Sequence, residues 1–463
     1  MTRSDRMMKV FKALLPSPFT IAVILSVITF LIALIWTDAP TDSDRPYALT
    51  LLTYWEQGLW EDGLMVFAMQ MMLMLVLGHA LALTKPVAWI INGALRACNN
   101  TANAAAIVTT LTIIVALFNW GLGLVFGAIF ARKVGEHAIK NNISLNYPLI
   151  GAAGYVGLMV WHGGISGSSL AKIAEDGHIQ NMMVGSMDQA SIAALPLSIG
   201  YSETVFSPMN LIVSAVLLIA LPAFMYWMGK RSKSGVPVLR KAVLPTPDSE
   251  ENIHGAERLD HSLILGISVG LIVLGYSIWK AFNAFEESGK FIDPNFINLF
   301  LFGSCILLHG RFSSFLKAIE EAIGGAAGIL IQFPLYFGIM GLMKYSGLVE
   351  VFSNFFINHS NATTYPIFTF ISAGIVNIFV PSGGGQWAVQ GPIIVQAATA
   401  MGIDLPKSIM AMAYGDQLTN MLQPFWALPL LGITGLKAKE ILPYTVLMMM
   451  VGAVIFVAAL LLF

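Results

Sequence analysis

Long apolar runs separated by short charged segments dominate the chain, and one of them is interrupted by three successive glycines. The interruption is Val380–Trp387, and its apolar flanks are Phe368–Phe379 and Ala388–Met401. Each flank has about 12–14 residues, whereas a helix needs about 20 residues to cross a hydrocarbon core of about 30 Å. We therefore predict a re-entrant hairpin at 366–401, which enters the membrane, turns at depth and leaves by the same side.

A second run, Ala104–Ala131, is broken near its middle by Asn119–Gly123. Basic residues precede this run at Arg96 and follow it at Arg132 and Lys133. Because basic residues gather on the cytoplasmic side, a hairpin at 104–131 that opens toward the cytoplasm keeps both groups there. A single kinked helix would place one group outside, and it remains the alternative.

Two other apolar runs contain polar interruptions. Tyr147–Val160 leads into the glycine- and serine-rich segment 161–169, and Leu405–Leu431 is interrupted at 415–424. Glycine and polar residues weaken a helix, and irregular backbone within a membrane is tolerated only where protein buries it or it lines a wet cavity. We predict two broken helices whose breaks lie at a functional site.

The apolar runs predict about nine transmembrane helices in addition to the two hairpins. They are Phe19–Trp36, Gly63–Leu83, Tyr147–Val160, Leu211–Met228, His261–Ala281, Phe296–His309, Ala322–Met343, Leu405–Leu431 and Ile441–Phe463. The basic N-terminus, from Arg3 to Lys12, is expected in the cytoplasm by the positive-inside rule. Tyr47–Trp60 mixes aromatic and polar residues and is expected to lie along the outer interface.

The order of these elements repeats once along the chain. Residues 1–229 form a first half and 261–463 a second half, joined by a basic cytoplasmic linker at 230–260. Each half contains a span, a hairpin, a broken helix and a last span, and an odd number of spans between the copies inverts the second. Inverted repeats with interrupted helices are typical of secondary transporters with a site near the bilayer midplane. The fold prediction is an all-α polytopic membrane protein, an inverted-repeat secondary transporter.

Composition supports this class of protein. Of the 463 residues, 56% are hydrophobic and 11% are charged, against about 25% charged residues in soluble proteins. The net charge of −1 provides no basic field, so nucleic acid is not expected as a partner. Cys98 and Cys305 are too few for a disulfide framework. The apolar run after the N-terminus is long, so we interpret it as a retained helix rather than a signal peptide.

Few ionisable residues lie within the apolar segments, where each of them is costly. His162 and Asp416 fall in the two helix breaks, whereas His79 and His309 lie near inner helix ends and are expected to be solvated. For Asp416, a structural role as a helix cap is the alternative to a functional role. Lys344 is expected near the outer face, and no buried Arg or Lys is expected.

Without a buried cation, an anion would be held by exposed N–H groups and helix N-termini, each equivalent to about +0.5 charge. This favours a compact monovalent anion with a small apolar tail over a dicarboxylate. The candidate substrate-binding residues are Asn119, Gly121, His162, Gly163, Ser166, Ser168, Ser382, Gly383, Gly384, Gly385, Gln386 and Asn420. The candidates for coupling to an ion or proton are Asp416, Gln417 and Thr419. We assign no catalytic residue, metal site or cofactor beyond a coupling H⁺ or Na⁺.

A family resemblance rests on four stretches. They are VPSGGGQWAVQGPI (Val380–Ile393), NWGLGLVFGAIFAR (Asn119–Arg132), VWHGGISGS (Val160–Ser168) and GDQLTNMLQPFWALP (Gly415–Pro429), and they resemble the bacterial short-chain fatty acid transporter family. The resemblance implies a carrier of acetoacetate, butyrate or a similar monocarboxylate in the bacterial inner membrane. It also implies membership of the ion transporter superfamily, which has two inverted repeats, each with a re-entrant hairpin and a broken helix.

The resemblance leaves the coupling ion open. Members of the superfamily that bind Na⁺ use Ser-Asn-Thr clusters at the hairpin tips, whereas the tips here read Asn119-Trp120-Gly121 and Pro381-Ser382-Gly383. Symport with H⁺ and symport with Na⁺ are therefore both retained. Elevator carriers often dimerise through a scaffold, so a homodimer is a further expectation.

Two other function classes remain as alternatives. Gly164–Gly167 fits the G-x-S-G pattern of rhomboid intramembrane proteases, which would make Ser166 a nucleophile and His79 or His309 its base. A channel would need a continuous polar stripe along a span, and no predicted span has one. We therefore predict a transporter and not an enzyme.

Overall fold

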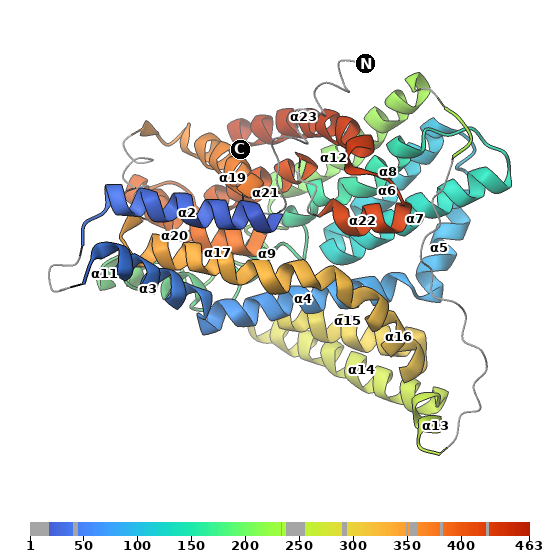
Figure 1. Cartoon of the computed structure of the whole chain (residues 1–463), viewed down its shortest axis with the longest axis horizontal. Helices are drawn as coiled ribbons and strands as arrows, with labels where there is room; N and C mark the ends of the chain where they lie inside the picture. Colours follow the sequence, from blue (N-terminus) through green and yellow to red (C-terminus); the bar gives the residue numbers. More distant parts are fainter. Residues whose placement is uncertain are drawn as a thin grey trace.

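The chain folds into helices joined by short connections, and no strand occurs among the residues that the structure describes. The computed structural model describes residues 18–39, 45–232, 234–237, 255–288, 294–348, 351, 359–379, 383–422 and 426–463. Most of the long helices lie roughly along the longest axis of the molecule (Figure 1). The prediction of an all-α fold is confirmed.

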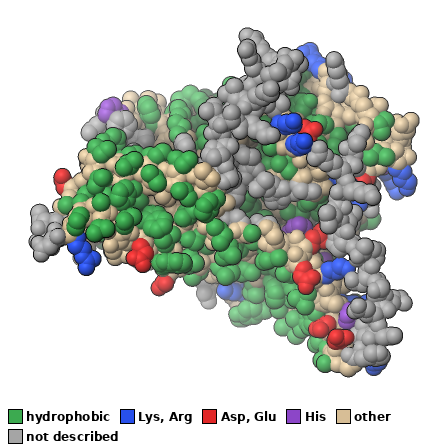
Figure 2. Space-filling view, in the orientation of Figure 1, with side chains coloured by type: hydrophobic (Ala, Val, Ile, Leu, Met, Phe, Trp, Pro, Cys, Tyr) green, Lys and Arg blue, Asp and Glu red, His purple; other side chains and the backbone are tan. Residues whose placement is uncertain are grey.

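Several helices are long and apolar enough to cross a membrane. Among the described residues, six meet both criteria, at Asp62–Leu81, Thr101–Phe118, Tyr147–Ile173, Pro208–Arg231, Leu263–Asn283 and Ala438–Leu462, and shorter apolar helices lie at Ala22–Trp36, Pro294–His309 and Tyr365–Ile378. Within Leu263–Asn283, only 17% of the 18-residue stretch that is apolar enough to span a membrane is buried within the protein. Hydrophobic side chains also cover much of the visible described surface over the first helix and its neighbours (Figure 2). Because water would not favour such a surface, we conclude that this is a multi-pass membrane protein.

The first half of the chain contains a run of long helices and then a series of short ones. The long helices are α2 (Pro18–Trp36), α3 (Tyr47–Leu59), α4 (Asp62–Ala82), α5 (Lys85–Leu95), α6 (Thr101–Phe118) and α7 (Trp120–Lys140). The elements that follow are α8 (Tyr147–Tyr155), η1 (Val156–Met159), η2 (Trp161–Gly163), α9 (Ser168–Ile173), α10 (His178–Met182), α11 (Gln189–Ala194) and α12 (Pro208–Arg231). Most of the predicted linker 230–260 lies outside the described residues.

The remaining described helices lie between residues 255 and 463. The first of them are α13 (Glu257–Asp260), α14 (Leu263–Ser288), α15 (Pro294–His309), α16 (Phe312–Ile323), η3 (Gly324–Ala326) and α17 (Ala327–Tyr345). The later elements are α19 (Tyr365–Phe379), α20 (Gly383–Met401), α21 (Leu405–Thr419), η4 (Asn420–Leu422), α22 (Ala427–Thr434) and α23 (Ala438–Leu462).

Helices α6 and α7 run antiparallel and are joined by the single residue Asn119. This residue ends α6, and its side chain accepts a hydrogen bond from the Leu122 backbone N–H at the start of α7. The backbones touch, since a Cβ at Gly123 would lie 2.6 Å from Cα of Ala116. The interruption is therefore shorter than the expected Asn119–Gly123, because glycine inside α7 allows close packing against α6 rather than breaking the helix.

Helices α19 and α20 also run antiparallel, but polar side chains connect them. The Tyr365 hydroxyl donates to the Ile394 carbonyl, and the Gln386 amide donates to the Ala373 carbonyl. The prediction that Gly383, Gly384 and Gly385 form the turn is wrong, because these residues form the first turn of α20. The residues between the two helices, 380–382, lie outside the described part of the chain, and Ser382 is among them.

The two broken helices also differ in detail from the prediction. Helix α8 ends at Tyr155, and the chain continues through the short 3₁₀ turns η1 and η2 before α9 begins at Ser168. In the second half, α21 stays helical through Thr419, so Asp416 and Gln417 lie within a helix and not in the expected break at 415–424. The helix ends five residues later than expected, because Asn420 begins the 3₁₀ turn η4.

The two halves pack against each other in a reciprocal way. Helix α4 packs against α15 and α16 of the second half, whereas α17 packs against α2 and α3 of the first half. In the same way, α7 packs against α22 and α20 packs against α9. Helices α7 and α20, which belong to different halves of the chain, therefore each have a neighbour from the other half.

Candidate functional site

The most deeply buried ionisable residues of the site form a pair between the two halves. The Nδ1 atom of His162, in η2, lies 2.6 Å from Oδ2 of Asp416, in α21, and both side chains are at most 1% exposed. The other ring nitrogen, Nε2, accepts a hydrogen bond from the Ser169 backbone N–H at 3.2 Å. Because a backbone N–H can only donate, Nδ1 carries the proton of a neutral ring and donates it to Asp416.

The segment around His162 is held by side chains from other helices. Gln417 Oε1 accepts hydrogen bonds from the backbone N–H groups of His162 and Gly163, at 2.9 and 3.1 Å. The amide of Asn210, in α12, donates to the Gly163 carbonyl at 2.8 Å. The Trp161 ring stacks on the His162 ring, with centroids 4.5 Å apart. These contacts satisfy backbone groups that the broken helix leaves without helical partners.

A second polar network joins α19 to the end of α21. The Asn377 amide donates to the Asp416 carbonyl at 2.6 Å and to the side-chain oxygens of Thr419 and Asn420 at 3.0 and 3.1 Å. Asn420 in turn donates to the Leu158 carbonyl, in η1. The hydroxyl of Thr419 also donates to the Gly374 carbonyl. Two of the candidate residues, Thr419 and Asn420, therefore fasten the broken helices to α19.

The tips of the two helix pairs converge on this site. A Cβ at Gly383 would lie 2.7 Å from Cε1 of His162, so the first turn of α20 touches the imidazole edge. The Trp120 backbone N–H, at the start of α7, donates to the Ser166 hydroxyl at 2.9 Å. The two tips border a cavity of about 10 Å³, room for about one water molecule. This tip cavity is lined by Met71, Trp120, Leu158, Trp161, Ser168, Phe333, Gly383 and Trp426.

The other candidate residues lie around this centre and not all of them face the tip cavity. Gly121 packs against the backbone of α4, and Asn119 is buried, with its Nδ2 lacking a partner among the described residues. Gly384 packs against the Phe67 ring, and Gln386 lies between α20 and α19. Gly385 is buried in the first turn of α20.

Two residues of the site were missed from the sequence. Ser169 places its hydroxyl 2.6 Å from Nε2 of His162, and the serine-rich segment before α9 was the only signal for it. Asn377 was missed although it is an amide in an otherwise apolar run, which is a signal for a buried polar contact.

No Arg or Lys was expected to be buried, and Lys172, at the end of an apolar segment, is partly buried. Lys172 lies within the apolar segment Tyr147–Ile173, and its side chain is only 14% exposed. Its ammonium group is 3.1 Å from both carboxylate oxygens of Glu175. A lysine can remain charged in such a place because a carboxylate three residues later compensates its charge.

The contacts of Ser166 do not favour the serine hydrolase alternative. Ser166 accepts a hydrogen bond at the tip of α7, and the serine placed against a histidine is Ser169, on His162. His309, one of the two proposed bases, lies with Nε2 2.9 Å from the Ala80 carbonyl. The comparisons with known proteins also point away from an enzyme.

A multi-pass helical protein with a buried polar site at converging helix tips has the architecture of a membrane transporter. Over residues 1–463 the chain matches the family described as "Short chain fatty acid transporter". The chain belongs to this family, as its sequence motifs predicted, and it is a transporter and not an enzyme.

Individual relatives agree with the family assignment. The chain is 36% identical over 453 residues to a protein of Escherichia coli K12 named "Putative short-chain fatty acid transporter", covering 97% of this chain and 96% of that protein. It is also 36% identical to a protein of the same name from Haemophilus influenzae Rd, covering 99% of both chains. Among solved structures, the YdaH transporter of Alcanivorax borkumensis has a TM-score of 0.53 at 15% identity, covering 96% of this chain and 98% of that one. This likeness supports the fold alone.

Proposed function

We propose that the protein is a secondary active transporter that carries acetoacetate, butyrate or a similar short-chain monocarboxylate together with a proton. The observation that carries the proposal is the buried His162–Asp416 pair in direct contact with Gly383 at the tip of α20. The names of the two relatives, which specify short-chain fatty acids, support the substrate class.

The substrate carboxylate would bind at the start of α20. The first N–H groups of a helix lack intrahelical partners and favour an anion. Because glycine has no Cβ, Gly383, Gly384 and Gly385 leave these groups unobstructed. Trp161, Trp120 and Phe333 around the tip cavity provide apolar contact for a short acyl tail. This combination suits a monovalent anion with a small apolar tail.

Coupling would follow from the charge of the His162–Asp416 pair. With a neutral imidazole and an ionised carboxylate the pair carries −1, which opposes a substrate anion nearby. A proton taken up by the pair removes that charge, which is worth up to about 4 kcal/mol for charges about 4 Å apart at an effective dielectric constant of about 20. Proton binding and substrate binding would therefore each promote the other. Oxygen atoms of Gln417 and Thr419 make Na⁺ coupling the competing proposal.

Movement between two sides of the membrane would use the inverted repeat. We propose that residues 1–229 and 261–463 are the two copies and that α6–α7 and α19–α20 are re-entrant hairpins. The reciprocal packing of α4 and α17 supports this proposal. Because the tip cavity holds about one water, the tips must separate to admit a substrate, by an elevator or a rocking motion. We further propose an inner-membrane location, a cytoplasmic N-terminus and a homodimer.

Transport assays in proteoliposomes test the proposal. We expect saturable uptake of labelled butyrate or acetoacetate that an inward proton gradient drives above equilibrium, with a sodium gradient as the competing condition. Asp416→Asn should abolish accumulation driven by the proton gradient while counterflow of substrate persists, because the residual exchange needs no coupling.

The matched control is Asp404→Asn, at the start of the same helix. Asp404 caps α21 through the Lys407 backbone N–H, and Asn caps a helix equally well. This variant should transport like the parent. Absence of saturable uptake of either acid would contradict the substrate assignment, and undiminished proton-driven uptake by Asp416→Asn would contradict the coupling role.

A further inference from the structure

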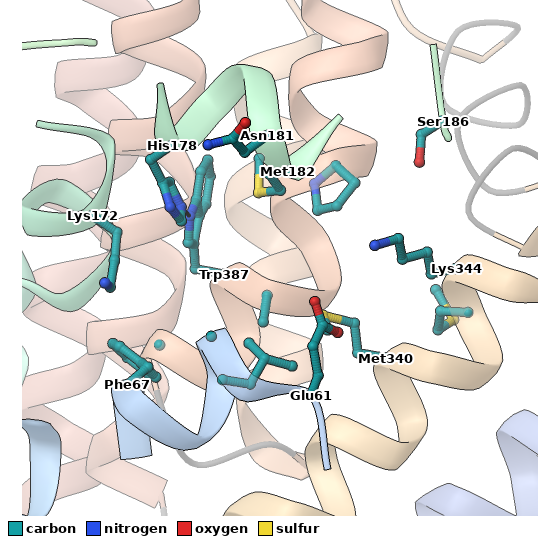
Figure 3. Close-up of a pocket in the computed structure, with 16 residues that line it drawn as sticks. Glu61, Phe67, Lys172, His178, Asn181, Met182, Ser186, Met340, Lys344 and Trp387 are labelled. Carbon is teal, nitrogen blue, oxygen red and sulfur yellow. Dashed lines mark hydrogen bonds between the residues drawn. The ribbon is translucent and has the colours of Figure 1, made fainter. Parts of the chain in front are cut away.

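A cavity of about 270 Å³ lies apart from the tip cavity, between α4, α10, α17 and α20. We refer to it as the lysine cavity, because Lys172 and Lys344 enter it from opposite sides (Figure 3). Glu61 precedes α4 and Lys344 lies in the last turn of α17, so the cavity lies near helix ends. In the proposed orientation these ends face the outside of the cell.

The lining combines apolar walls with charged side chains. Phe67 and Trp387 contribute aromatic surface. The charged residues of the lining are Lys172, Lys344 and Glu61. The Trp387 indole N–H donates to Nε2 of His178 at 3.1 Å, so this nitrogen is an acceptor of a neutral ring. The lining residues therefore include two cations and one carboxylate, and Glu175, outside the lining, is a further partner of Lys172.

Of the two lysines, Lys172 is the better placed to contact a bound carboxylate. Its Nζ atom lies 5.9 Å from the centre of the Phe67 ring, and only 14% of its side chain is exposed. A carboxylate bound there would share the ammonium group with Glu175 and would be shielded from water. Its alkyl tail would then lie along Phe67 and Trp387.

An aromatic wall separates the lysine cavity from the tip cavity. Phe67 lines the first cavity and Phe333 lines the second. The two rings are nearly parallel, with centroids 6.2 Å apart. On the other side, Phe67 fills the space that a side chain at Gly384 would need, since a Cβ there would fall 1.5 Å from its Cζ atom. The absence of a side chain at Gly384 thus allows Phe67 to close the wall against α20.

We propose that the lysine cavity is a second binding site for a short-chain monocarboxylate, with Lys172 as its cationic contact and Phe67 as the wall that separates it from the tip cavity. The inference rests on the proposed function only for the chemical class of the ligand. A volume of about 270 Å³ is near the lower end of the range of small-molecule pockets, which suits an acid of about four to six carbons.

Equilibrium binding of labelled butyrate and hexanoate to the purified full chain in detergent tests the site. Lys172→Gln should weaken binding about tenfold or more, since a buried charged contact is lost. Unlabelled butyrate should compete with the label, whereas neutral butyramide should not. Trp387→Phe should remove the fluorescence quenching that 6-bromohexanoate causes in the parent.

The matched control is Lys133→Gln. Lys133 also pairs with a glutamate three residues later, Glu136, but it is 48% exposed and does not line the cavity. Its replacement should leave binding unchanged. Equal binding by Lys172→Gln and the parent, or an equal loss in Lys133→Gln, would overturn the proposal.

The wall is tested by thiol labelling of Ser168→Cys, a position on the tip cavity, in a chain with Cys98→Ala and Cys305→Ala. Adding Phe67→Ala should speed the reaction with a charged methanethiosulfonate reagent at least several-fold, because it joins the two cavities. An unchanged rate would contradict the role of Phe67.

Binding and transport can fail separately. Binding that depends on Lys172 without saturable uptake would overturn the transport proposal and leave the second site intact. Proton-driven uptake with binding that is insensitive to Lys172→Gln would overturn the second site alone.

Discussion

The two antiparallel helix pairs whose tips meet at the site are held together by different forces. Between α6 and α7 the backbones touch, with Gly123 against Ala116. Between α19 and α20 the connections are hydrogen bonds from side chains, such as Gln386 to the Ala373 carbonyl. A contact between backbones cannot loosen without losing packing, whereas a side-chain hydrogen bond can be exchanged for another.

The contacts at the tips of the two helix pairs differ in the same way. The α7 tip is fixed by Asn119 and by the bond from Trp120 to Ser166. The first turn of α20 instead rests on the edges of His162 and Phe67 without side chains of its own. The difference predicts that α6–α7 is the more rigid pair and that α19–α20 is the more mobile one, and the following predictions test it.

The largest effect is expected at the close contacts of α7. A Cβ at Gly127 would lie 2.0 Å from the Gly154 carbonyl oxygen on α8, and backbone must shift to admit it. Gly127→Ala should therefore destabilise the fold by about 1–3 kcal/mol, seen as a lower melting temperature in detergent.

The control for this prediction is Gly275→Ala in α14, where a Cβ would meet nothing within 4 Å. Alanine is the better helix former, so the control should be neutral or up to about 1 kcal/mol more stable. Equal melting temperatures for Gly127→Ala and the parent would remove the case for a rigid α6–α7 pair.

A smaller effect is expected at the junction of α6 and α7. Asn119→Ala removes the cap on the Leu122 N–H and should cost about 1–2 kcal/mol, the upper part of the range for helix caps. Asn100→Ala, which removes the exposed cap of α6, should cost less. Thermal unfolding of both variants measures the difference, and a larger loss in Asn100→Ala would mean that the tip is not a fixed point.

Loosening of the other pair should have a smaller thermal cost but a larger effect on motion. Gln386→Leu keeps the volume and loses the bonds to the Ala373 carbonyl and to Gln390, worth about 1 kcal/mol in total stability. Hydrogen–deuterium exchange should become faster in α20 and stay unchanged in α7. Gln57→Leu, on the surface of α3, is the control, and equal exchange in α20 for both variants would refute the mobile role.

The smallest effect at neutral pH concerns the contact between α20 and α10. Burial, with a lesser contribution from Lys172, lowers the pKa of His178 from 6.5 to about 4. The folded protein thus disfavours the proton that the unfolded chain accepts, so this residue should lower stability as the pH falls from about 6.5 to about 4 and add nothing further below. His178→Gln should flatten the fall in melting temperature over this window.

Hydropathy, charge and helix-breaking residues were sufficient to predict the class of fold and the approximate positions of most helices. Lipid imposes a length and an apolar composition on each span separately, so Pro18–Trp36 and Ala438–Leu462 could be placed within a few residues. The family followed from motifs such as VWHGGISGS for the same reason, since each motif is a local pattern.

Helix ends were harder to predict, because glycine has two uses. At Gly383, Gly384 and Gly123 the absence of a side chain allows close packing inside or at the start of a helix. Because glycine was treated only as a residue that weakens helices, both interruptions were predicted to be longer than they are. Packing partners far along the chain determined which use applied.

Pairing within the site depended on tertiary structure altogether. His162 and Asp416 were both recognised as costly residues in apolar segments, but they are 254 positions apart, and nothing local indicates that they form a hydrogen bond with each other. Ser169, Asn377 and the partly buried Lys172 acquire their roles only from neighbours on other helices. The membrane acts on each segment by itself, whereas a buried polar contact exists only once two segments have packed together.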